Sequence, residues 1–130
     1  MKRMIRSAVE ILGMARVGYL GDSEAYEVYV NTNDGGNIPH FHLRNSKDWD
    51  KFHSCIKIMS AEYFEHQGKE HKLNASLLKD LCKFLSSPVQ SEKYRDKFEN
   101  NWQLICFLWE LNNSNMMIPD GTEMPDYSKL

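Results

Sequence analysis

The chain has 130 residues, which suits one domain of ordinary size and leaves no room for a second. Hydrophobic residues make up 42% and charged residues 26%, a composition that excludes collagen-like and disordered chains. Lys and Arg number 16 against 18 Asp and Glu, so the net charge of −2 does not favour nucleic acid as a partner. We expect a cytoplasmic protein with no membrane partner, because no apolar run approaches ~18 residues and no cleavage pattern follows the basic N-terminus.

The first half of the chain predicts one short helix followed by strands. Apolar residues at helical spacing over residues 3–13 predict the helix, and Gly13 is its expected end. The period then changes toward two, which is typical of strands, and the Asn- and Gly-rich run at residues 33–37 predicts a tight hairpin turn. The predicted strands cover residues 14–20, 26–30, 39–44 and 52–59, and residues 63–73 are interpreted as a further hairpin around Gln67-Gly68.

The last third of the chain predicts two helices. Asn74 is the expected cap of the first, which ends before Ser86-Ser87-Pro88. Ser91 is the expected cap of the second, which continues to Asn112 with aromatic residues along one stripe. We therefore predict an α+β fold: a mostly antiparallel sheet of three to five strands covered by two C-terminal helices, plus the short N-terminal helix. Residues 1–112 form the predicted domain, and residues 113–130 form an irregular C-terminal tail whose Met116-Met117-Ile118 run docks on the body or on another subunit.

The strongest candidate site lies on the predicted strand at residues 39–44. Side chains alternate between the two faces of a strand, so His40, His42 and Arg44 share one face. Two imidazoles can bind a divalent metal ion such as zinc, manganese or nickel. Alternatively, one histidine can act as a base while Arg44 holds an anion, which makes these three residues the catalytic candidates. The simpler alternative is that both histidines are hydrogen-bonded residues that only shape a surface.

Known His-x-His motifs limit the metal hypothesis. A cupin requires a glutamate where this chain has Ser46 or Lys47, and the histidine-triad hydrolases carry a histidine where this chain has Arg44. A zinc hydrolase requires a third ligand, and His53 on the next strand is the candidate that we place with His40 and His42 in the predicted metal site. Other residues that can approach are Glu62, Glu65 and His71.

The three cysteines carry no zinc-finger signal. Cys55, Cys82 and Cys106 are widely spaced, lie in apolar stretches and form no Cys-x-x-Cys pair. We interpret all three as reduced residues of the core, because free cysteine is among the most buried residue types.

Residues 26–112 resemble a small bacterial family known as domain of unknown function 4160. The resemblance is carried by the Pro-His-Phe-His run at residues 39–42 after a turn, by the strand around Ile56, by the helix of residues 74–85 and by Asn101-Trp102. The family's usual Pro-Pro before the first histidine is Ile38-Pro39 here, and this chain adds an N-terminal helix, an insertion around residues 45–52 and a tail. The resemblance implies a compact bacterial or mobile-element protein with a toxin–antitoxin or regulatory role, and it transfers no catalytic residues.

Two functions remain open, and with them whether the protein is an enzyme. The first is a non-enzymatic interaction or regulatory module, in which the aromatic helix face and the apolar tail contact a protein partner or a second copy of the chain. The second is a small metal- or anion-dependent hydrolase that acts on a nucleotide or RNA phosphate through His40, His42 and Arg44. The first is preferred narrowly, because spacing alone supplies no third ligand and no general base.

Overall fold

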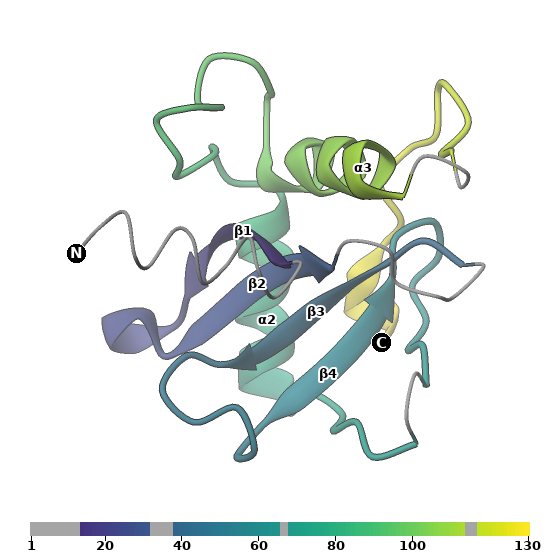
Figure 1. Ribbon diagram of the computed structural model, residues 1–130. Coiled ribbons are helices and arrows are strands. Elements are labelled where there is room, and N and C mark those ends of the chain that lie inside the picture. The colour runs from purple at the N-terminus through teal and green to yellow at the C-terminus, as the bar shows by residue number, and fades with distance from the viewer. Residues whose placement is uncertain (1–13, 32–37, 66–67, 114–116) are drawn as a thin grey trace.

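The computed structural model describes residues 14–31, 38–65, 68–113 and 117–130 (Figure 1). Four strands form one antiparallel sheet in the order β1-β2-β3-β4, and the predicted α+β class is confirmed. The predicted helix at residues 3–13 and the predicted turn at residues 33–37 lie outside the described residues. No helix in the described ranges is both long and apolar enough to cross a membrane. The elements are β1 (Met14–Leu20), the 3-10 turn η1 (Asp22–Glu24), β2 (Tyr26–Asn31), β3 (His40–Asn45), β4 (His53–Lys57), α2 (Ala75–Leu85), α3 (Asn101–Asn112) and the 3-10 turn η2 (Tyr127–Lys129).

The two faces of the sheet differ in chemistry, as the alternating sequence predicts. On one face, Val28 pairs with Leu43 and Phe41 pairs with Ile56, and all four side chains are fully buried in the core. Helix α2 lies behind the sheet in Figure 1 and contributes Leu81 and other apolar residues to the same core. The opposite face carries polar and aromatic side chains, because a shift of one residue along a strand reverses the direction of its side chain.

Helix α2 forms where the sequence predicts it. The Asn74 side chain accepts a hydrogen bond from the Leu77 amide at 2.8 Å, which satisfies one of the free donors at the start of the helix. The helix ends at Leu85, before the two serines and Pro88.

The predicted start of the second helix at Ser91 is wrong. Residues 92–97 form turns, and α3 begins only at Asn101. Its cap is Asn100, whose side chain accepts from the Gln103 amide at 2.8 Å. The predicted aromatic stripe is therefore divided: Tyr94 and Phe98 precede the helix and pack against Phe107, and the Trp102 and Trp109 side chains of the helix are buried in the core.

Helix α3 crosses the end of the sheet at which β2 and β4 finish. Near the start of the helix, the Trp102 indole donates to the Ile58 carbonyl at 3.4 Å. Just past its end, the Asn113 amide donates to the Asn31 carbonyl at 3.1 Å. The C-terminal segment returns to the same end of the sheet, where the buried Tyr127 hydroxyl donates to the Ile58 carbonyl at 2.7 Å. Residues 117–130 therefore add Ile118 and Tyr127 to the core.

Both outer strands carry hydrogen-bond partners at some positions of their free edges. The segment that follows β4 bonds back to it, and Ile56 forms an isolated bridge with Tyr63. Gln67, at the turn of the hairpin predicted for residues 63–73, lies outside the described residues, and on either side of it Phe64 and His71 form backbone bonds to β4. At the other edge, the Gln90 side chain accepts from the Tyr19 amide at 2.9 Å and donates to the Tyr19 carbonyl at 2.8 Å. The bonds along β4 join the Lys57 amide to the Glu62 carbonyl, the Phe64 amide to the Cys55 carbonyl and the His71 amide to the His53 carbonyl.

Candidate metal centre

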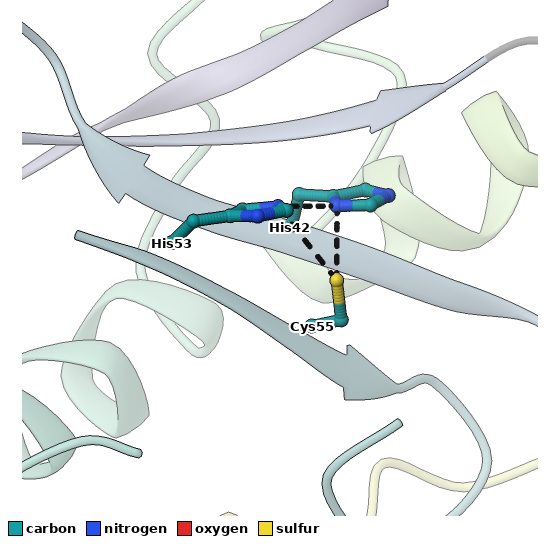
Figure 2. Close-up of side chains that lie close together, drawn as sticks. All are labelled: His42, His53 and Cys55. Atoms are coloured by element: carbon teal, nitrogen blue, oxygen red, sulfur yellow. Dashed lines mark hydrogen bonds between the residues drawn. The ribbon is translucent and has the colours of Figure 1, made fainter. Parts of the chain in front are cut away.

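Three possible metal ligands meet on the polar face of the sheet, between β3 and β4 (Figure 2). The strand register places His42 directly opposite Cys55. His53 lies two residues before Cys55 on β4, so its side chain leaves the same face. Antiparallel pairing therefore brings together two residues that are two positions apart and a third from the neighbouring strand.

The separations between the three ligand atoms are close to those of a tetrahedral zinc site. His42 Nδ1 lies 2.9 Å from His53 Nε2 and 3.2 Å from Cys55 Sγ, and Cys55 Sγ lies 3.7 Å from His53 Nε2 (Figure 2). Tetrahedral zinc with ordinary bond lengths requires about 3.3 Å between nitrogens and about 3.6 Å between nitrogen and sulfur. Each separation is therefore within about half an ångström of the value that zinc requires.

The centre is buried and bounded by an aromatic ring. His42 is 2% exposed and Cys55 is fully buried, whereas His53 is partly exposed. The Tyr29 ring stacks on His42 with its centroid 4.8 Å away, and its hydroxyl lies 3.3 Å from His53 Nε2. Burial raises the pKa of Tyr29 well above its ordinary value, so its phenol is neutral at pH 7. The Asn31 amide completes the surroundings, with Nδ2 3.4 Å from His42 Nε2.

Arg44, the predicted anion clamp, is paired with a buried carboxylate. Its Nε and Nη2 atoms donate to Glu27 Oε1 at 2.8 and 2.7 Å, and Arg16 pairs with the other carboxylate oxygen. The guanidinium carbon of Arg44 lies 4.1 Å from the centroid of the Tyr29 ring and 3.3 Å from the centroid of the Trp49 ring. These contacts fix the plane of the guanidinium and use one of its two edges.

A cleft of about 350 Å³ opens beside His53. Its volume is that of a small-molecule site. His53 belongs to both the cleft and the metal centre, so the cleft is the side from which a small molecule would approach an ion held there. The lining residues are Met14, Tyr29, Asn31, Arg44, Trp49, Asp50 and His53.

The other predicted ligands lie outside this group. His40 shares the face but is fully buried, donates from Nδ1 to the Ile38 carbonyl at 2.8 Å and packs its ring against Phe64. The Nδ1 atom of His71 accepts from the His53 amide at 3.2 Å. Glu62 pairs with Lys57 at 3.1 Å on the surface, and Glu65 is also exposed.

Sequence reasoning named two of the three clustered residues and missed Cys55. The cysteine was interpreted as a core residue, and it is indeed buried, but on the polar face rather than on the apolar one. The signal that finds it is the His53-Ser54-Cys55 spacing on a strand, which places both ligands on one face.

Comparison with family models, with curated proteins and with solved structures found no match for this chain. The resemblance to domain of unknown function 4160 therefore stays a prediction.

Proposed function

We propose that the protein binds a zinc ion through His42 Nδ1, His53 Nε2 and Cys55 Sγ. The observation that supports the proposal is the clustering of these three ligand atoms, all within 4.8 Å of one another. Two imidazoles and a thiolate favour zinc over manganese, which prefers oxygen ligands, and zinc accepts the tetrahedral arrangement more readily than nickel.

The number of ligands favours a reactive ion over a purely structural one. Structural zinc sites have four protein ligands, whereas catalytic sites have three and keep one position for water or substrate. Zinc lowers the pKa of a bound water to about 7, which supplies a nucleophile for hydrolysis. The cleft beside His53 is large enough for a small substrate. The proposal thus develops the hydrolase hypothesis, with Cys55 in place of His40.

A zinc titration tests the proposal. The tag-free protein competes with a chromophoric chelator for zinc, and we expect one zinc ion per chain. His42→Ala, His53→Ala and Cys55→Ser should each weaken binding at least 100-fold, because each removes one ligand atom. Cys82→Ser is the matched control, since Cys82 lies outside the cluster, and it should bind zinc as the wild type does. A wild type without zinc affinity, or a Cys55→Ser variant with unchanged affinity, contradicts the proposal.

A second function, protein interaction, is supported by the outer face of α3 and the segment after it. Phe107 and Leu111 are one helical turn apart and are 36% and 60% exposed, and Met117 is 65% exposed. This function agrees with the regulatory role that the family resemblance implies. Sedimentation of the wild type and of a Leu111→Glu variant tests it: a self-associating wild type and a monomeric variant support it, and a monomeric wild type that captures no partner contradicts it.

A further inference from the structure

The cleft beside the metal centre contains a hydrogen-bond donor that is only weakly used. Arg44 directs Nε and Nη2 at Glu27, but its Nη1 atom donates to the Met14 thioether at 3.8 Å. A thioether sulfur is a weak acceptor. Both Arg44 and Met14 line the cleft, and the Arg44 side chain is only 5% exposed. A nearly buried cationic donor therefore borders a space large enough for a small molecule.

The charges around this donor favour an anion. Among the residues that the structure describes, Arg16 and Arg44 share one carboxylate, that of Glu27, so two cations face a single anion there. Charge-assisted hydrogen bonds from guanidinium to phosphate or carboxylate are stronger than neutral ones, particularly where water is largely excluded. Asp50 also lines the cleft, but it is exposed, so its opposing charge is screened by solvent.

A second donor faces the same space from the metal centre. Tyr29 lines the cleft, and its neutral hydroxyl lies 3.3 Å from His53 Nε2. An oxyanion that accepts from both Arg44 and Tyr29 would lie on the His53 side of the cleft.

We propose that this cleft binds a small oxyanion, a phosphate or a carboxylate, through Arg44 Nη1 and the Tyr29 hydroxyl. The proposal names the substrate class of the proposed zinc site and rests on it for the chemistry that follows binding, whereas the two donors belong to the chain with or without zinc. Arg44 thus has two roles, in which one edge holds Glu27 and the remaining nitrogen contacts the ligand.

Calorimetric titration with inorganic phosphate and with acetate tests the proposal in zinc-loaded and zinc-free protein. The Tyr29→Phe variant removes the hydroxyl and keeps the ring that stacks on His42. The Arg44→Met/Glu27→Gln double variant removes the guanidinium without leaving a buried carboxylate unpaired. Arg44→Lys is a second variant, which retains a charge beside Glu27 and loses Nη1. Arg95→Met is the matched control, because it removes an exposed guanidinium that does not line the cleft, and it should bind the anion as the wild type does. Circular dichroism confirms folding of each variant.

We expect the wild type to bind one oxyanion, Tyr29→Phe to weaken binding about 5-fold, and both Arg44 variants to weaken it at least 10-fold. Tighter binding of phosphate identifies a phosphoester substrate, and tighter binding of acetate identifies a carboxylate substrate. If the zinc-loaded protein binds neither anion, or if the Arg44 variants bind them as the wild type does, the oxyanion site is excluded while the zinc site stands. If zinc does not bind but phosphate binds through Arg44, the proposed function fails and the oxyanion site remains.

Discussion

His42 Nδ1 and His53 Nε2 lie 2.9 Å apart on neighbouring antiparallel strands, so one of these two ring nitrogens carries the hydrogen between them. The Asn31 amide nitrogen lies 3.4 Å from the other nitrogen of His42, Nε2, and donates to it. This contact places the His42 hydrogen on Nδ1. A metal ion on Nδ1 requires the opposite tautomer, with the hydrogen on Nε2 and an acceptor facing it.

Replacement of Asn31 by aspartate should therefore strengthen zinc binding. A carboxylate accepts from Nε2 and favours the tautomer whose Nδ1 is free to bind metal, so we expect Asn31→Asp to raise zinc affinity by about 10-fold. Asn31→Leu removes the partner and should lower the affinity. Chelator competition measures both effects, and long-range proton–nitrogen NMR identifies the His42 tautomer. An Asn31→Asp variant with the wild-type tautomer and wild-type affinity would show that Asn31 does not position His42.

Alkaline pH should destabilise the fold partly through Cys106. Burial, with a smaller contribution from Glu110, raises the pKa of the Cys106 thiol to about 12, whereas an unfolded cysteine titrates near 8.5. Between those values the unfolded chain has lost a proton that the folded chain still holds, so stability decreases as pH rises. Urea unfolding at pH 8 and pH 10 should show a smaller loss of stability in Cys106→Ala than in the wild type. Equal losses would mean that Cys106 titrates normally.

The junction between the two helices should depend on the buried Asn101. Its side-chain nitrogen donates to the Phe84 carbonyl at 2.8 Å and approaches the Pro88 carbonyl at 3.4 Å. Asn101→Ala leaves a buried carbonyl without this donor, so we expect a loss of about 2 kcal/mol in the free energy of unfolding. Asn112→Ala is the control, because that partly exposed side chain donates to the Leu108 carbonyl within α3, and its effect should be under about 1 kcal/mol. Similar losses of stability in Asn101→Ala and Asn112→Ala would show that the buried Asn101 hydrogen bonds do not stabilise the junction.

Gly18 should not accept a larger side chain as long as the Gln90 side chain is bonded to the Tyr19 backbone. A Cβ atom at Gly18 would lie 2.7 Å from Gln90 Oε1, so Gly18→Ala must displace the amide that bonds to Tyr19. We expect a loss of about 1–2 kcal/mol, since each neutral hydrogen bond contributes about 1 kcal/mol. In a Gln90→Ala background the same substitution should have a smaller effect, with the Phe84 ring carbon at 3.1 Å as the remaining close contact. Additive effects in chemical unfolding would show that the two residues act independently.

The sequence predicted the sheet well because its signals are local. Alternation within residues 39–44 sets which side chains face the core, and the structure confirms that His40, His42 and Arg44 share a face. The start of α3 was not predictable from Ser91 alone, because Asn100 is an equally good cap and the choice depends on Asn101 reaching the Phe84 carbonyl in the folded state.

The metal centre was only partly predictable for a related reason. Spacing along β3 identified His42, but it does not say which residue of β4 lies opposite. That relation depends on strand register, which pairs His42 with Cys55 and brings His53 within reach. Register is a property of two strands together, so the sequence of one strand alone does not identify Cys55 as the third ligand.

The hydrogen bonds at both edges of the sheet limit how copies of this chain can associate. A bare outer strand is a template for another strand, and this is the usual route to ordered aggregates. Here Gln90 occupies the amide and the carbonyl of Tyr19 on β1, and the segment after β4 occupies the Lys57 amide and the carbonyls of Cys55 and His53. Growth of the sheet by addition of a neighbouring molecule is therefore blocked at these positions.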